Sequence, residues 1–449
     1  MKLCAALLCL FPGMAAACAL PPSVILTLPT GHYMAGAAGT VALTGLLLAR
    51  ADHVPDIRPR LLAERPILLP VTLTSTASFV AHAALLFVGW FGASDPMHNL
   101  LTLWVWVGLW VALPLASMAF GNIWRALNPL TGPARLIRLA LGLRGGIALA
   151  RLGHWPAVAG LFAFTWFTLV SLSPEDPRVL ATVAAAYAAI MLALAVAEGE
   201  DWLEQGEFLT VYLGWLARIA PLWLVLHGSR ARLMAGFPGT QVLTLPPLAP
   251  SAVAFLTLAL AGLTFDGLRD TFFWLGLIGE NPLEFTGRSA VRGINTAGLL
   301  AVWAATSATI LGALALGQRL AGRAMPVGPV MLSFLAIAAG YHGAHYLVTL
   351  LTTGQYAIAA LNDPLFRGDS LLGLQPFFVG FGFLADPAAM TAVWNTQFAA
   401  ILGAHLLATL LALRLAGPGL PARAHLPLTA LMVGYTVLGL WLLAQPTGA

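Results

Sequence analysis

Long apolar segments recur along the whole chain, and they constrain the fold more than any other feature of the sequence. About 20 consecutive apolar residues are enough for a helix to cross the hydrocarbon core of a bilayer. Only 9% of the 449 residues are charged, against about 25% in soluble domains. We therefore predict an all-α, polytopic transmembrane helix bundle with about ten spans, at 32–49, 68–91, 98–119, 155–173, 179–198, 250–266, 294–317, 328–352, 392–414 and 426–444.

An eleventh apolar segment, 208–227, is interrupted by Arg218 and Pro221. If this segment crosses fully, the bundle has eleven spans and the arginines that follow it, such as Arg319, lie outside the cell. If it dips into the membrane and returns, they lie inside, as positively charged connectors usually do. A segment broken by proline can be re-entrant where protein covers its backbone, and we expect that arrangement here.

The connectors differ in charge, which predicts the orientation of the spans. The segments 50–65 and 121–152 are rich in arginine, whereas the connectors at Asp95 and Glu175 are poor in it. The positive-inside rule assigns the first two to the cytoplasm. The sequence thus predicts a multi-pass protein of the bacterial inner membrane with both termini in the periplasm.

The first 19 residues resemble a secretory signal peptide, with Lys2, an apolar stretch and a run of small residues near Ala19. All three cysteines, Cys4, Cys9 and Cys18, lie in this segment. Cleavage would leave residues 20–449 as a single polytopic membrane domain without a thiol. The net charge of +4 contains no dense basic patch, so we expect no nucleic-acid partner.

Two connectors are predicted to be structured. In 121–152, a helix start at Asn128-Pro129 is followed by apolar residues alternating with Arg135 and Arg138, which indicates an amphipathic cytoplasmic helix. The segment 353–391 is predicted to be a periplasmic cap loop.

Ionisable residues inside apolar segments are costly, so they point to a polar site. Asp266, His345 and His405 fall on three different predicted spans and could together bind a divalent metal ion. His342, Asn99 and Gln355 are candidates for an additional polar site. The alternative is that each histidine bonds a neighbouring carbonyl and only stabilises helix packing.

Short motifs scattered over the chain resemble those of integral membrane proteins known as fenitrothion hydrolases. They are Leu28-Pro29, Phe120-Gly121-Asn122, Asn128-Pro129, Phe265-Asp266-Gly267, Ala344-His345-Tyr346, Gln355, Asp363-Pro364 and Gly403-Ala404-His405. The resemblance implies hydrolysis of an organophosphate triester and carries over no catalytic residues. Leu20-Pro21-Pro22 stands where members of that family have a histidine, so no N-terminal metal ligand is expected.

Two functions remain open at this point. In the first, the protein is an inner-membrane hydrolase that uses a metal-activated water on an apolar ester, taken up from the periplasmic side. In the second, it is a non-enzymatic transporter, or a membrane subunit that handles a metal ion or protons. Its partners would be the lipid bilayer, an apolar small molecule and a second membrane subunit.

Reporter fusions test the orientation. Because of the arginine distribution, fusions at Arg144 and Arg319 should report a cytoplasmic location, and a fusion at Asp369 should report the periplasm. A periplasmic signal at Arg319 would show that 208–227 crosses the membrane.

Overall fold

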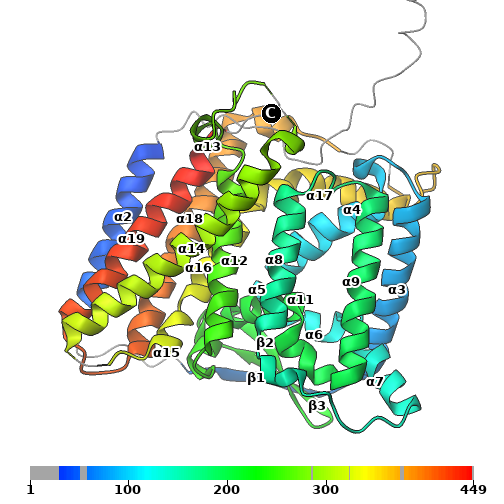
Figure 1. Cartoon of the computed structure of the whole chain (residues 1–449), viewed down its shortest axis with the longest axis horizontal. Coiled ribbons are helices and arrows are strands. Elements are labelled where there is room, and N and C mark those ends of the chain that lie inside the picture. The colour runs from blue at the N-terminus through cyan, green and yellow to red at the C-terminus, as the bar shows by residue number, and fades with distance from the viewer. Residues whose placement is uncertain (1–29, 51–57, 285–286, 323, 375–378, 447–449) are drawn as a thin grey trace, which may run out of the picture.

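The computed structural model describes residues 30–50, 58–284, 287–322, 324–374 and 379–446, and these form a helical bundle (Figure 1). The all-α class predicted from the sequence is confirmed. The predicted signal peptide, 1–19, lies outside the described residues.

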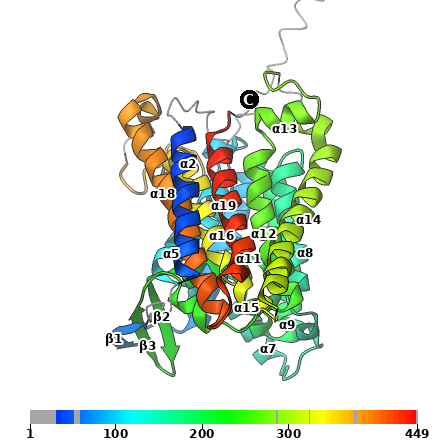
Figure 2. The same ribbon diagram turned by 90° about the vertical axis from the view of Figure 1, so that its left-hand side faces the viewer.

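Eight of the described helical segments are long and apolar enough to cross a membrane. Two further helices, α2 (Thr30–Leu48) and α8 (Trp155–Val170), run alongside them (Figures 1 and 2). If all of these cross, the chain has ten spans, and that number stays a prediction. The eight segments are α3 (Val71–Phe91), α4-η2-α5 (Leu100–Leu103, Trp104–Ala112 and Leu113–Phe120), α9 (Pro177–Glu198), α12 (Pro250–Leu268), α14 (Arg288–Ala321), α15-α16 (Val327–Met331 and Phe334–His345), α18 (Pro387–Ala416) and α19 (Ala422–Ala444).

The bundle has two different ends, seen at the bottom and top of Figure 1. The sheet end carries β1 (Arg60–Pro66), β2 (Leu222–His227), β3 (Arg230–Ala235), α6 (Trp124–Leu127), α7 (Thr131–Ala140), η3 (Leu149–Leu152), η4 (Glu200–Trp202), α10 (Leu203–Gly206), η5 (Ala217–Ile219) and η6 (Thr240–Thr244). Helix α11 (Phe208–Leu216) lies inside the bundle against α5, α8 and α16. The cap end carries η1 (Pro96–His98), α13 (Phe272–Leu277), α17 (Leu347–Asn362) and η7 (Gly382–Ala385).

Most described arginines lie at the sheet end. Among those in the described part of the chain, only Arg178, Arg269, Arg288, Arg292 and Arg367 lie near the cap end. The ends of α14 and α18, with Arg319 and Arg414, therefore share a side with α7 and the sheet.

Helices α12 and α15-α16 form the centre of the bundle. Their most apolar windows are 67% and 72% buried inside the protein, against 11% for α3. The large side chains that α3 exposes, Leu73, Val80, Phe87 and Phe91, are apolar, as expected of a helix in contact with lipid. Polar side chains on α12 and α16 therefore lie where protein, rather than lipid, can satisfy them.

The predicted span 328–352 differs from the structure. Helix α16 ends at His345, and a separate helix, α17, runs from Leu347 to Asn362 and packs against α4, η1 and η2. Part of the predicted cap loop 353–391 is therefore helical, and its irregular part lies between Asn362 and Pro387. The apolar pattern continues through the break, which is why the sequence did not indicate it.

The segment 208–227 does not form one long helix. Helix α11 begins after Glu207, whose carboxylate accepts hydrogen bonds from the backbone of Leu209 and Thr210. It ends before Pro221, and the chain continues as strand β2. A two-residue turn at Gly228-Ser229, with φ of 58° at the glycine, joins β2 to β3, as in a type II′ hairpin.

The predicted amphipathic helix of 121–152 is shorter than expected. Only α7, from Thr131 to Ala140, forms a helix of more than one turn in this segment. Arg135 on α7 bonds Glu200 at 2.8 Å, and Arg138 bonds the carbonyl of Gly145 at 2.9 Å. The chain after Ala140 is thus held by a side chain rather than by helix.

Gly340 allows α16 and α18 to pack closely. A Cβ atom at this position would lie 2.2 Å from the Cβ of Ala404 and 2.9 Å from the carbonyl oxygen of Ala400. At Gly343, the nearest atom to such a Cβ is the flexible end of Leu115, at 3.4 Å.

We predict that Gly340→Ala destabilises the protein by roughly 1–3 kcal/mol, because the two helices must separate. Gly343→Ala is the matched control and should have little effect. Thermal unfolding of the purified variants in detergent measures the difference, and equal stability of the two variants would contradict the packing described here.

Candidate functional site

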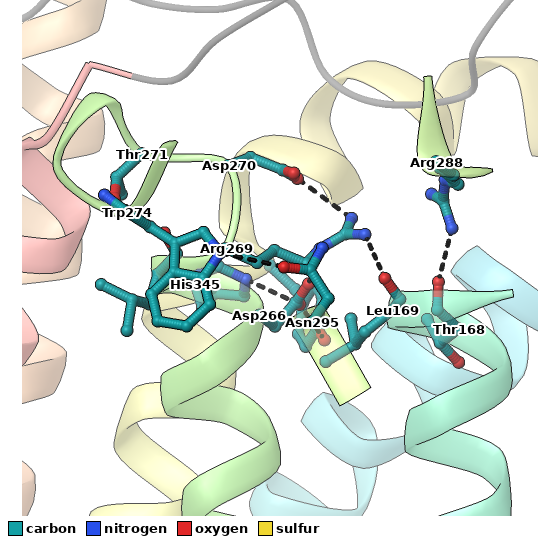
Figure 3. A network of polar contacts seen from close by, with 12 residues as sticks. Thr168, Leu169, Asp266, Arg269, Asp270, Thr271, Trp274, Arg288, Asn295 and His345 are labelled. Carbon is teal, nitrogen blue, oxygen red and sulfur yellow. Dashed lines mark hydrogen bonds and ion pairs between the residues drawn. The ribbon is translucent and has the colours of Figure 1, made fainter. Parts of the chain in front are cut away.

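Asp266 and His345 are brought together by the two central helices (Figure 3). Asp266 lies near the end of α12 and His345 is the last residue of α16. The Nε2 atom of His345 lies 2.9 Å from Oδ2 of Asp266. The side chain of the aspartate is 16% exposed and that of the histidine 20% exposed. The pair therefore lies inside the bundle but keeps some access from outside.

Two further residues complete the surroundings of the Asp266 carboxylate. The hydroxyl of Tyr346 donates to Oδ2 at 2.7 Å. Oδ1 faces Nε of Arg269, one turn further along the chain, at 3.7 Å. A carboxylate with two donors and a nearby cation stays charged at a lower cost than an isolated one.

Arg269 links the site to the end of α8 (Figure 3). Its Nη1 donates to the carbonyl of Leu169 at 2.7 Å, and its Nη2 lies 3.0 Å from Asp270. Arg288 donates to the carbonyl of Thr168 at 3.0 Å. Helix α8 is short, and these two arginines satisfy carbonyls in its last turn, where a helix favours cations.

His345 keeps one ring nitrogen available. Its Nε2 bonds the carboxylate, while Nδ1 has no hydrogen-bond partner among the described residues. The ring is held flat against Tyr341, with centroids 5.6 Å apart and planes at 11°. An imidazole oriented by a carboxylate, with its second nitrogen free, can accept a proton from water or coordinate a metal ion.

A small cavity is lined by Asp266 and Tyr346 but not by His345. The centre of a water molecule can occupy about 20 Å³ of it, which is enough for one ordered water. Its polar wall consists of Asp266, Tyr346, Tyr212, Thr165 and Thr168, and aromatic and aliphatic side chains form the rest.

His342, one turn before Tyr346, is fully buried and hydrogen-bonded at both ring nitrogens. Nε2 donates to the carbonyl of Trp110 at 2.9 Å, so Nδ1 accepts from the hydroxyl of Tyr212, also at 2.9 Å. Trp110 lies in η2, which is a π-helix. His342 satisfies that carbonyl, which is a structural role.

His405 does not join the Asp266–His345 pair. Its Nδ1 donates to the carbonyl of Ile401, one turn earlier on α18, and its Nε2 is buried without a partner among the described residues. The predicted three-residue site is therefore corrected to a pair. The intrahelical bond explains the difference, because it holds the ring against its own helix.

Asn99 and Gln355, predicted as members of an additional polar site, instead hydrogen-bond backbone groups. Asn99 caps α4 by accepting from Leu101, and it donates to carbonyls near the end of α3. Gln355 bonds both backbone groups of Gly380 and so ties α17 to the loop before α18. Neither side chain contacts the Asp266–His345 pair.

Within the described part of the chain, no group of three or more His, Cys, Asp or Glu residues is arranged to hold a metal ion. Asp266 and His345 provide two potential ligands. Protein metal sites with an open position usually have three, so the described residues fit a metal ion only incompletely.

Sequence reasoning missed Tyr346 and Arg269. Tyr346 directly follows His345, and Arg269 stands one turn after Asp266, the spacing at which helix side chains meet. The spacing of Arg269 was therefore a usable signal. The hydroxyl of Tyr346 reaches Asp266 from the first residue after α16, and the sequence does not indicate where α16 ends.

We predict that Arg269→Met destabilises the protein by about 3–5 kcal/mol, since it leaves a buried carboxylate without its cation. Adding Asp266→Asn should recover part of the loss, because the uncompensated charge is then removed. Arg135→Met, at an ion pair whose arginine is 48% exposed, is the control and should cost less than about 1 kcal/mol. Chemical unfolding in detergent gives all three values, and a fully additive double variant would contradict the coupling.

Comparisons of the chain with protein-family models, with curated proteins and with solved structures found no match. Its function therefore has to be inferred from its own residues and their geometry.

Proposed function

We propose that the protein is a membrane-embedded hydrolase in which Asp266 and His345 activate a water molecule. The observation that carries this proposal is the hydrogen bonding of His345: Nε2 bonds the partly buried carboxylate of Asp266, and Nδ1 has no partner among the described residues. This is the arrangement of a general base and the group that orients it.

In the proposed reaction, Nδ1 of His345 takes a proton from water as the water attacks the ester. Asp266 holds the ring in the tautomer that leaves Nδ1 unprotonated, and it stabilises the imidazolium that forms. Tyr346 and Arg269 keep Asp266 charged. The imidazolium then returns its proton to the leaving group, so the cycle ends with the base restored.

The proposed substrate is an apolar ester, such as an organophosphate triester. The pair lies near the cap end of a bundle of apolar helices, and an apolar ester concentrates in the surrounding lipid. The motifs Phe265-Asp266-Gly267 and Ala344-His345-Tyr346 resemble those of fenitrothion hydrolases, and this resemblance also supports an organophosphate triester as substrate. By its arginine content the sheet end is assigned to the cytoplasm of an inner membrane, which makes the cap end and both termini periplasmic.

A metal-assisted form of the same reaction uses the same two residues. Asp266 and His345 would hold a divalent ion, and the ion would lower the pKa of a bound water. The remaining ligands would have to be water or substrate.

Transport is the second candidate function. Discontinuous helices that begin or end inside a bundle are typical of transporters. Here Glu207, which is only 1% exposed, caps the short helix α11, and the span from Val327 ends in a break at Tyr346. A transporter acts only across a sealed membrane, whereas a hydrolase also acts in detergent.

Hydrolysis by purified protein in detergent tests the proposal. With a chromogenic aryl phosphotriester, Asp266→Asn and His345→Gln should each lower the rate by about 10²–10⁴-fold, the usual contribution of general acid–base catalysis. The matched control is His98→Gln, because His98 forms an aspartate–histidine pair with Asp95 at 2.8 Å whose side chains are 38% and 42% exposed.

Wild-type protein without hydrolytic activity in detergent, combined with substrate uptake in proteoliposomes, would favour transport. Elemental analysis of the same samples separates the two forms of the hydrolase. A metal ion present in the wild type and lost in His345→Gln would favour the metal-assisted form.

A further inference from the structure

The sheet at the sheet end has two different faces. Residues paired across neighbouring strands lie on the same face, and the face alternates along each strand. The pairs Leu224–Leu233 and Leu233–Ala63 therefore share a face with Leu226–Ala231 and Ala231–Arg65. We call this the leucine face, and its members are Leu222, Leu224, Leu226, Ala231, Leu233, Ala235, Ala63, Arg60 and Arg65.

The opposite face packs on the bundle at one end and is charged at the other. Trp223 is buried, and it lies so close to Gly121 that a Cβ there would be 2.8 Å from the Cβ of the tryptophan. Further along, Glu64 lies 3.2 Å from both Arg230 and Arg232. Hydrogen bonding by Arg230 lowers the pKa of Glu64, so the acidic group on this face is ionised and paired.

The leucine face is partly exposed, and Leu222, Leu226 and Leu233 on it are half-buried. Leu224 is 60% exposed, and Arg60 and Arg65 are exposed beside it on the edge strand β1. Neither of these two arginines makes an ion pair with a described residue. The leucine face thus combines large apolar side chains with cations and has no acidic residue.

Two contacts fix the sheet at the level where α3 begins and α5 ends. The backbone N–H of Ile67 donates to the carbonyl of Ser229, at the hairpin turn, at 2.9 Å. Ile67 precedes the start of α3 by only four residues, and Leu68, next to it, is 87% exposed. At the other end of the sheet, Gly121 directly follows the end of α5. Figure 2 shows the sheet at the lower edge of the bundle, below α5.

We propose that the leucine face rests on the membrane surface, with its leucines at the boundary of the acyl chains and with Arg60 and Arg65 on the phosphates of anionic phospholipids. Apolar side chains favour that boundary, and arginines close to the surface are attracted to anionic headgroups. Long arginine side chains can reach the headgroups while their stems cover apolar surface. The sheet is then a lipid-binding element that is independent of the Asp266–His345 site.

The depth of single labels tests this proposal. The chain has three cysteines, Cys4, Cys9 and Cys18, which are replaced by serine. A bimane label is then placed through Leu224→Cys or, as the matched control on the opposite face, Val225→Cys. In nanodiscs with nitroxide-labelled lipid headgroups, the label at 224 should be quenched at least about two-fold more than the label at 225, because only the leucine face meets lipid.

Lipid charge provides the second measurement. Phosphatidylglycerol should raise the melting temperature of the full-length protein in nanodiscs relative to phosphatidylcholine, and Arg60→Gln/Arg65→Gln should abolish that gain. The control Arg144→Gln/Arg151→Gln removes the same charge elsewhere at the sheet end and should retain the gain in melting temperature. Equal quenching at 224 and 225, no quenching at 224, or equal loss of the lipid effect in both double variants would overturn the proposal. A label at 224 that is shielded by a copurifying protein would do so as well.

Discussion

The partly buried charge of Asp266 is the constraint on which the centre of the bundle depends. A carboxylate removed from water must be hydrogen-bonded or paired, and the hydrocarbon around a helix bundle provides neither. Here the partners come from two directions: His345 and Tyr346 lie on one side, and Arg269 on the other. Because Arg269 also bonds the end of α8, satisfying one carboxylate fixes the relative positions of α8, α12 and α16.

Much of the helix pattern could be predicted from the sequence, because apolar length is a direct consequence of membrane thickness. Nine of the ten predicted segments fall on one helical segment each, and the tenth, 328–352, is divided at Tyr346. Apolar length does not reveal such a break, because both helices are apolar. The same limit applies to 208–227, where β2 reads Leu-Trp-Leu-Val-Leu-His and is as apolar as a span.

At the candidate site, too, the residue types indicated some members correctly, while the geometry of the helices decided which of them meet. The free-energy cost of placing ionisable side chains in apolar segments identified Asp266 and His345 as candidates, and these two side chains are in contact. The same reasoning included His405, which instead bonds Ile401 on its own helix. A histidine can hydrogen-bond a backbone carbonyl of its own helix, as His405 does. An aspartate near the end of a helix has few donors on its own helix. The prediction was therefore more reliable for Asp266, whose hydrogen-bond partners come from another helix.

His342 and His345 illustrate why position on one helix does not decide function. They lie three residues apart on α16 and therefore on nearly the same face of the helix, yet each contacts different residues. His342 meets the carbonyl of Trp110 and the hydroxyl of Tyr212, which uses both of its nitrogens. His345 meets one carboxylate, is 20% exposed and keeps Nδ1 free. A proton acceptor needs a free nitrogen and some exposure, and of these two histidines only His345 has both.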